Sequence, residues 1–263
     1  MKMFCVTHLP IVGLEDAEVT PIYVGRGTCP DGWLRDDTGD NIHEKNATFC
    51  ELTAQYWVWK NLLKLASPTA IFGFCHYRRF FGTTGLLPMD RFAESDKSNG
   101  ANLLRAFQMS SADVVLPFPL RFDAFPVRGK LLFLYQQIKR GHLVPYWKHS
   151  IYTDFNCFHS GKHLLRAAEL LDAEYRQEFL RHIRTSSTLY PFNMYVSSSR
   201  ILSDYFDALF PWLFRCEKEL EVNLEDSYQR RLFGFLAERF CSYYFARRYS
   251  ILEAPIFSLR QEG

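Results

Sequence analysis

Short apolar runs alternate with stretches of helical periodicity along most of the chain, and this alternation constrains the fold more than any other feature. Residues 70–75 (AIFGFC) and 112–117 (ADVVLP) have the composition of strands that are covered on both faces. Residues 48–65 and 200–221 instead repeat apolar side chains at helical spacing. Strands and helices that alternate in this way predict an α/β fold with a mostly parallel central sheet flanked by helices.

Further elements are expected toward both ends of the chain. Residues 3–8 and 21–25 read as strands, residues 189–197 as another strand, and residues 227–248 as a final helix. A chain of 263 residues with 48% apolar side chains can bury one large core. We therefore expect a single domain over residues 1–263.

Composition argues against several functions. The formal net charge is +2, from 31 basic and 29 acidic residues, so nothing in the charge calls for nucleic acid as a partner. The seven cysteines are scattered without a C-x-x-C pair and the histidines are dispersed, so neither a disulfide framework nor a metal site is expected. No apolar run approaches the ~18 residues of a membrane helix, and the first ten residues read as a strand, not a signal peptide. These features predict a cytoplasmic protein.

The segment HYRRFF, residues 76–81, follows directly on a predicted strand and must place two arginines near an anion. Ligands of open parallel sheets bind outside the carboxyl ends of the strands, where His76, Arg78 and Arg79 stand. The planar guanidinium group suits the paired oxygens of a phosphate. If the strand continued, Arg78 and Arg79 would point to opposite faces. Pairing with the protein's own carboxylates is the structural alternative.

A second cluster of charged residues lies at the start of the predicted final helix. Asp226 is placed to cap that helix. Arg230 and Arg231 fall in its first turns, where the helix dipole disfavours cations, so an anion is expected near them. Glu238 shares a helix face with Arg231, and the two form either a buried structural clamp or part of a site.

The polar segment 36–46 precedes the helix predicted over 48–65, in which Thr48 and Glu51 suit a capping box. Such a segment is either a solvated turn or a site for a hydroxyl-rich or anionic ligand. Its candidate ligand-binding residues are Asp37, Asn41, Glu44 and Lys45. Asn193 stands inside the apolar run 189–197, so its amide must bond either the backbone or a substrate hydroxyl.

Residues 121–149 interrupt the alternation with a basic and aromatic stretch in which Asp123 is the single acid. This stretch is either an ordinary solvated insertion or a surface that contacts an anionic membrane or a lipid-linked phosphate. The chain has no G-x-G-x-x-G, no Walker loop and no G-x-S-x-G, and the Asp-x-Asp metal motif is missing from the strand ends.

Four segments together resemble a known family: residues 36–61, 73–81 (GFCHYRRFF), 192–198 (FNMYVSS) and 225–240 (EDSYQRRLFGFLAERF). They are similar to the bacterial galactofuranosyltransferases first catalogued as a domain of unknown function in capsule and O-antigen gene clusters. The resemblance implies a GT-A-like fold and transfer of galactofuranose from UDP-galactofuranose to a glycan or an undecaprenyl-diphosphate-linked acceptor at the cytoplasmic membrane face. One departure is Ser227, which stands where the family tends to have proline, and a second is the basic stretch 121–149, which is less typical of the family and is expected to be an insertion or an acceptor-side segment that governs acceptor choice.

The resemblance and the residue pattern together suggest a mechanism. Arginines would replace a metal ion in stabilising the UDP leaving group, so we predict metal-independent activity, with a divalent cation as the alternative. Inverting transfer needs a general base, for which Asp226 is the first candidate and Glu238 the second. Thr7 and His8, which end the first strand, suit the nucleotide pocket. The predicted substrate-binding residues are Thr7, His8, Asp37, Asn41, Glu44, Lys45, His76, Arg78, Arg79, Asn193, Gln229, Arg230 and Arg231.

Three other functions compete with this one. A catalytically silent module that binds nucleotides or glycans would also lack the metal motif. A related transferase that uses a different UDP-sugar would differ only in the shape of its pocket. A nucleic-acid-binding protein would use the basic stretch, but the near-neutral charge and the lack of a recognition motif argue against it.

Overall fold

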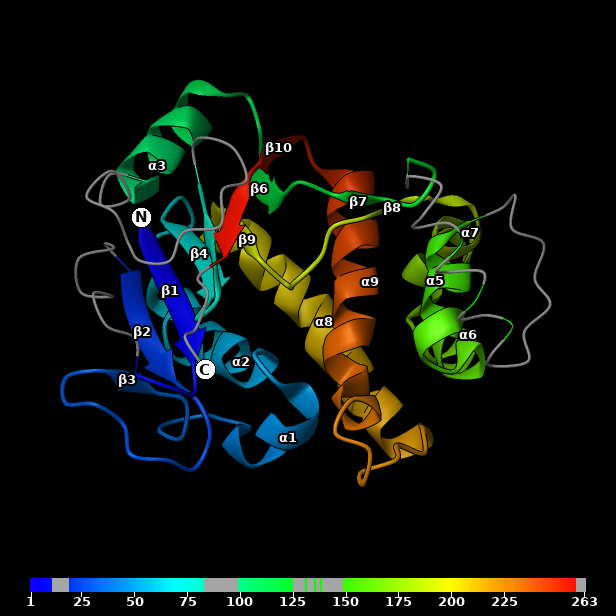
Figure 1. Ribbon diagram of the computed structural model, residues 1–263. Coiled ribbons are helices and arrows are strands. Elements are labelled where there is room, and N and C mark those ends of the chain that lie inside the picture. Colours follow the sequence, from blue (N-terminus) through cyan, green and yellow to red (C-terminus); the bar gives the residue numbers. More distant parts are fainter. Residues whose placement is uncertain are drawn as a thin grey trace.

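The computed structural model describes residues 1–10, 19–82, 99–124 and 149–258, together with the single positions 131, 135 and 138. Most of the basic stretch 121–149 therefore lies outside the described residues. Figure 1 shows a twisted sheet beside helices α8 and α9, with helices α5, α6 and α7 on the far side of α9.

The main path of the central sheet has the strand order β10-β6-β9-β4-β1-β2-β3. Its strands are β1 (Lys2–Thr7), β2 (Val19–Tyr23), β3 (Leu34–Arg35), β4 (Ile71–His76), β6 (Val114–Pro117), β9 (Tyr195–Ser198) and β10 (Ile251–Ala254). Strand β1 pairs in parallel with β2 and β4, as β2 does with β3 and β10 with β6. Strand β9 runs antiparallel to both of its neighbours. Strands β5 (Arg79–Phe81) and β11 (Ile256–Ser258) extend the sheet beside β4, and β7 (Leu120–Arg121) pairs with β8 (Thr188–Leu189) apart from it.

Helices cover both faces of this sheet, as the alternation of apolar runs and helical stretches predicts. The α-helices are α1 (Asn46–Phe49), α2 (Leu52–Asn61), α3 (Asn99–Met109), α5 (Ile151–Phe158), α6 (Gly161–Glu169), α7 (Ala173–Thr185), α8 (Ser199–Glu219) and α9 (Leu232–Arg248). Short 3-10 turns occupy η2 (His43–Lys45), η3 (Leu63–Leu65) and η5 (Gln229–Arg231).

Alternate residues of β1 enter two separate cores. Phe4 and Val6 pack in the larger cluster with α2, α8 and α9, whereas Met3 and Cys5 pack in the smaller one beneath α3. Gly73 of β4 lies where a Cβ would come within 2.7 Å of Val196 and 2.8 Å of Met3. Only glycine therefore allows β4 to sit between its two neighbours at this position.

The helix predicted over 48–65 is in fact broken near its start. Helix α1 ends at Phe49, and Cys50 takes a left-handed conformation with φ of 52° before α2 begins at Leu52. The predicted capping box was wrong, because the hydroxyl of Thr48 bonds the carbonyl of Lys45 and no side chain caps α2. The break leaves Glu51 between α1 and α2, where it lines a cavity and does not continue a helix.

Two other predicted boundaries also move. The run 189–197 is not one strand, since Phe192 and Asn193 have φ values of 75° and 49° and separate β8 from β9. The final helix begins at Leu232, so Arg230 and Arg231 lie in the preceding 3-10 turn and not in the helix. Phe192, Arg230 and Arg231 all line a cavity at the carboxyl ends of β1 and β4.

Candidate functional site

A cavity of about 470 Å³ opens at the carboxyl ends of β1 and β4. The chain passes from β1 to β2 and β3 on one side and returns to β4 on the other, so this is the point where the strand order reverses. Ligands of open α/β sheets bind at such switch points. The lining residues are Val6, Thr7, His8, Val24, Asn46, Ala47, Cys50, Glu51, His76, Tyr77, Arg78, Arg79, Phe192, Arg230, Arg231 and Glu238.

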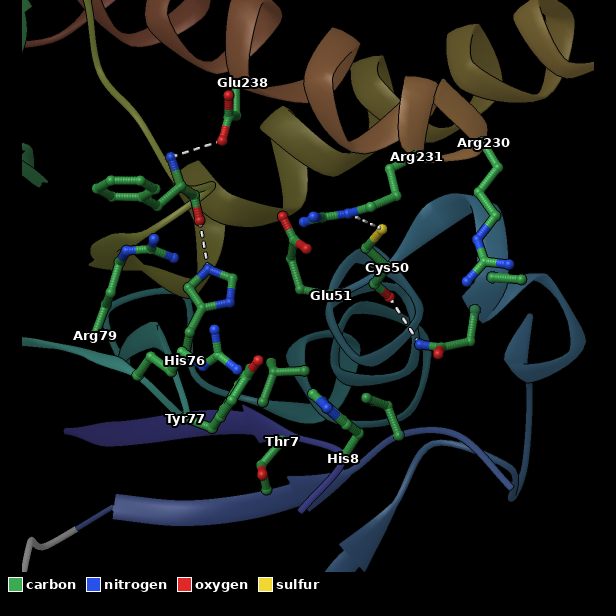
Figure 2. Close-up of a pocket in the computed structure, with 16 residues that line it drawn as sticks. Thr7, His8, Cys50, Glu51, His76, Tyr77, Arg79, Arg230, Arg231 and Glu238 are labelled. Atoms are coloured by element: carbon green, nitrogen blue, oxygen red, sulfur yellow. Dashed lines mark hydrogen bonds between the residues drawn. The ribbon is translucent and has the colours of Figure 1, made fainter. Parts of the chain in front are cut away.

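The cavity has two walls (Figure 2). The ends of β1 and β4 form one wall, and the α1–α2 turn, the η5 turn and α9 form the other. Residues predicted from sequence to bind substrate or to catalyse meet here from both walls. They are Thr7, His8, His76, Arg78, Arg79, Arg230, Arg231 and Glu238.

The two arginines of HYRRFF line one cavity and do not diverge to opposite faces of the sheet. Strand β4 ends at His76, and a tight turn through Tyr77 and Arg78 returns the chain antiparallel into β5. The Arg78 guanidinium lies 4.8 Å from the centre of the Tyr77 ring, and the Tyr77 ring packs edge-on against His8. The hairpin therefore gathers cationic and aromatic groups at one point of the sheet edge.

Arg79 lies over an aromatic ring, and no carboxylate of the described residues pairs with it. Its guanidinium is 4.0 Å from the centre of the Phe192 ring, and burial lowers its pKa from the ordinary value. Arg231 points its Nε at the thiol of Cys50, 3.4 Å away. Burial raises the pKa of that thiol to about 11, so Cys50 is neutral at pH 7.

In the described part of the chain, none of Arg79, Arg230 and Arg231 forms an ion pair with a carboxylate. Among the described residues, protein carboxylates are therefore not the anions that these three arginines meet. Four lining arginines face two lining glutamates, so the cavity carries an excess of positive charge. Such a concentration of cations favours an anionic ligand.

The two lining carboxylates have different surroundings. Glu238 accepts hydrogen bonds at both oxygens, from the backbone N–H of Phe192 at 2.9 Å and from Arg239 at 2.9 Å. Burial raises its pKa, although Arg239 counteracts this effect. Arg239 itself is 5% exposed and also pairs with Asp154 of α5 at 3.1 Å. Glu238 is thus held by a buried ion-pair network.

Glu51 has one oxygen committed and one directed toward the cavity. Its Oε1 accepts a hydrogen bond of 2.8 Å from the amide of Asn193, which also donates to the carbonyl of Gly234. Figure 2 shows the Glu51 carboxylate between His76 and Arg231. Asn193, predicted as a substrate-binding residue, is buried behind this wall and orients Glu51.

His76 completes the wall as a neutral side chain. Its Nε2 bonds the backbone carbonyl of Phe192, and because a carbonyl only accepts, Nε2 carries the proton. Burial lowers the pKa of the imidazole, which leaves it uncharged at pH 7. The Phe192–Asn193 turn is therefore tied to both walls, through His76 and through Glu238.

The other predicted site residues lie outside the lining and have structural contacts. Asp37 pairs with Arg35, Glu44 with Arg26 and Lys45 with Glu217. Asn41 bonds the backbone of Gly39 and His43. Asp226 accepts from the backbone N–H groups of Tyr228 and Gln229, and Gln229 bonds His159 and the carbonyl of Phe158.

Sequence reasoning did not find Glu51, Cys50, Asn46 or Phe192 in the cavity wall. The apolar spacing of residues 48–65 indicated one continuous helix, which hid the break at Cys50. Phe192 and Asn193 were hidden in the same way by an apolar run that resembled a strand. Left-handed turns at residues other than glycine leave little trace in a single sequence.

Two searches of the described residues bear on metals and membranes. No group of three or more histidine, cysteine, aspartate or glutamate side chains is arranged to hold a metal ion in this part of the chain. Among its helices, none has the length and apolar character needed to cross a bilayer.

A cation-rich cavity at the switch point of a mostly parallel sheet is typical of α/β proteins that bind phosphorylated ligands. Residues 2–249 match the model of the family described as "Domain of unknown function (DUF4422)", and the chain belongs to that family. No curated protein matches the chain at a significant level.

One solved structure shares this fold, the apo form of the bifunctional glycosyltransferase WbbM. The TM-score is 0.78 at 23% sequence identity, and the match covers 99% of this chain and 45% of WbbM. The chain thus spans less than half the length of that protein. The likeness and the mostly parallel sheet confirm the expected GT-A-like fold.

Proposed function

We propose that this chain is a glycosyltransferase that binds a UDP-sugar in the cavity at the ends of β1 and β4. The observation that carries the proposal is that Arg79, Arg230 and Arg231, around the switch point of the sheet, have no carboxylate partner among the described residues. A nucleotide diphosphate supplies the anion that these cations lack. The fold shared with a glycosyltransferase supports the same reaction class.

The leaving group explains why cations are needed. In the reaction, an acceptor oxygen bonds to the anomeric carbon while the bond from that carbon to the β-phosphate oxygen breaks. The bonding electron pair leaves with UDP, so negative charge grows on the diphosphate. Arginines held in place before the reaction, as Arg79 is by Phe192, stabilise this charge without reorganising. The chemistry requires no metal ion, although a divalent cation near the diphosphate would serve the same purpose.

The acceptor hydroxyl must also lose a proton, and we assign Glu51 as the base of an inverting reaction. Glu51 lines the cavity and directs one oxygen into it, whereas both oxygens of Glu238 accept hydrogen bonds from the protein. Asp226, the first candidate from sequence, caps the η5 turn outside the lining. Glu238 then acts by holding the Phe192 turn and tuning the field at Glu51.

The donor is proposed to be UDP-galactofuranose, and the acceptor a glycan or an undecaprenyl-diphosphate-linked glycan of a bacterial surface polysaccharide. This finer assignment rests on the four segments that resemble galactofuranosyltransferases. It also implies work at the cytoplasmic face of the inner membrane, with the basic stretch 121–149 as the contact with anionic lipid.

A panel of UDP-sugars tests the donor and the reaction class together. UDP release would be measured with UDP-galactofuranose, UDP-galactopyranose and UDP-glucose, each with EDTA and with Mn²⁺. We expect release from UDP-galactofuranose in EDTA. Release from another donor would replace the sugar and keep the reaction class. Release in Mn²⁺ alone would refute the metal-free mechanism, and binding of UDP without release from any donor would indicate a silent binding module.

A further inference from the structure

An aromatic side chain stands exposed beside the cavity and is not used by the mechanism above. Tyr228 is 42% exposed and directly precedes the η5 turn, which contains Arg230 and Arg231. Its ring stacks on His159 with centroids 5.0 Å apart and planes 10° from parallel. Phe235 of α9 packs against the same ring at 5.0 Å. We call these three rings the Tyr228 platform.

The platform is held in place by its own contacts. His159 is buried, and its Nδ1 lies 3.1 Å from the amide oxygen of Gln229, the residue that follows Tyr228. The amide nitrogen of Gln229 donates to the backbone carbonyl of Phe158 at 3.0 Å. Asp226 caps the same turn through the backbone N–H of Tyr228 at 2.8 Å. Little conformational entropy is left to lose when a ligand covers the exposed ring face.

The platform is continuous with the helical wall of the cavity. Phe235 packs against the Tyr228 ring, and the centre of its own ring also lies 5.5 Å from the Arg231 guanidinium. The tyrosine is therefore linked through Phe235 to Arg231, which lies on the same wall of the cavity as Glu51 and Glu238. This second wall is where the nucleophile must approach if the donor's nucleotide lies over the strand ends.

We propose that the Tyr228 platform is the acceptor subsite, on which a sugar ring of the acceptor glycan stacks; this inference rests on the proposed function. One face of a pyranose or furanose ring is lined with C–H groups and is apolar enough to pack on an aromatic ring. Tyrosine offers such a ring with a hydroxyl at its edge that can bond the sugar's own hydroxyls. A half-exposed tyrosine that packs on Phe235, the ring beside the cavity residue Arg231, has the chemistry to hold a carbohydrate and not a phosphate.

A uracil base could also stack on tyrosine, so the test must separate the two ligands. The variants are Tyr228→Ala, Tyr228→Leu and Tyr228→Phe. Leucine keeps apolar packing against His159 without a flat ring, and phenylalanine keeps the ring without the hydroxyl. Leu65→Ala changes another exposed apolar residue, 86% exposed and outside the cavity lining, and serves as the control. Unchanged melting temperatures establish that each variant folds.

Two measurements are made on each protein. The first is the binding of methyl glycosides of galactose, glucose, N-acetylglucosamine and rhamnose. Saturation-transfer NMR at the sugar C–H protons detects this binding. The second is the Kd for UDP, measured by calorimetry. Where turnover is measurable, the KM for the acceptor is determined as well. We expect Tyr228→Ala and Tyr228→Leu to abolish the saturation signal and raise the acceptor KM by roughly 5- to 30-fold, with the UDP Kd unchanged. Tyr228→Phe and Leu65→Ala should stay within about threefold of the wild type.

The outcomes separate this inference from the proposed function. A rise in the UDP Kd without a change in glycoside binding would assign the ring to the base and overturn the acceptor subsite. Wild-type saturation signals that do not depend on Tyr228, or no signal from any glycoside, would also overturn it. A signal that depends on Tyr228 in a protein that neither binds UDP nor turns over would retain the subsite and reject the transferase.

Discussion

Replacing Arg79 with methionine should weaken UDP binding without weakening the fold. Arg79 is half-buried and lies over the Phe192 ring, and within the described residues no carboxylate pairs with it. Methionine keeps an unbranched chain on that ring, and its sulfur packs well against aromatic groups. The substitution therefore removes the charge and leaves most of the packing.

The substitution should have a large effect on UDP binding and a small effect on the free energy of unfolding. A hydrogen bond between charged groups contributes about 1.5–3 kcal/mol, so the Kd for UDP should rise about 10- to 150-fold. The lost cation–π contact costs about 0.5–1 kcal/mol of folding free energy, and relief of the desolvated cation offsets part of that cost. The free energy of unfolding should thus change by less than about 1 kcal/mol.

Calorimetric titration with UDP in EDTA and urea denaturation would measure the two quantities on the same preparations. Arg35→Met is the matched control, because Arg35 also lies over a ring, that of Tyr23, but pairs with Asp37 at 2.6 Å outside the cavity. Its UDP affinity should equal that of the wild type. If Arg79→Met bound UDP within threefold of the wild type and lost about 3 kcal/mol or more of stability, Arg79 would be a structural residue and the reasoning refuted.

Other predictions concern the carboxylates and their network. Glu51→Gln should lower turnover about 10²- to 10⁴-fold and leave the UDP Kd unchanged. Asp226→Asn should keep wild-type turnover, because its side-chain oxygen can still accept from the backbone of the η5 turn. The reverse pattern in single-turnover assays would restore Asp226 as the base. Arg239→Met should cost about 3–5 kcal/mol in urea denaturation, because it leaves Asp154 and Glu238 buried without their cation, and a loss below 1 kcal/mol would contradict this account. Because burial raises the folded-state pKa of Glu238, its contribution to stability is complete below the unfolded carboxyl pKa of about 4.3 and is lost as pH rises through the folded value. The stability of the wild type relative to Glu238→Gln should therefore fall as pH rises above about 4, and parallel pH profiles of unfolding would count against the raised pKa.

Much of the fold could be predicted from the sequence because buried strands and helices require characteristic patterns of apolar residues. The runs at 70–75 and 112–117 became β4 and β6, and the helix expected over 200–221 became α8. Covered strands must be apolar on both faces and helices must repeat near 3.6 residues, so both patterns survive in a single sequence. The antiparallel direction of β9 left no comparable mark, because direction depends on the connections and not on side-chain pattern.

The cavity was predictable where it follows from the sheet and not where it depends on turns. His76, Arg78 and Arg79 could be predicted because they follow β4, and the end of β4 lies at the point where the strand order reverses. Glu51 was missed because it looked like a helix cap, and only the left-handed Cys50 turns it into the cavity. The residues of the 36–46 segment were placed by polarity alone, and the charges of Asp37, Glu44 and Lys45 form ion pairs with Arg35, Arg26 and Glu217.

A crystal structure of the complex with UDP, grown in EDTA, tests the central claim most directly. We expect the uridine over the ends of β1 and β2 and the diphosphate within about 2.7–2.9 Å of the guanidinium groups of Arg79 and Arg231. A diphosphate bound away from both arginines, or a nucleotide that occupies another part of the chain with this cavity filled only by solvent, would contradict it.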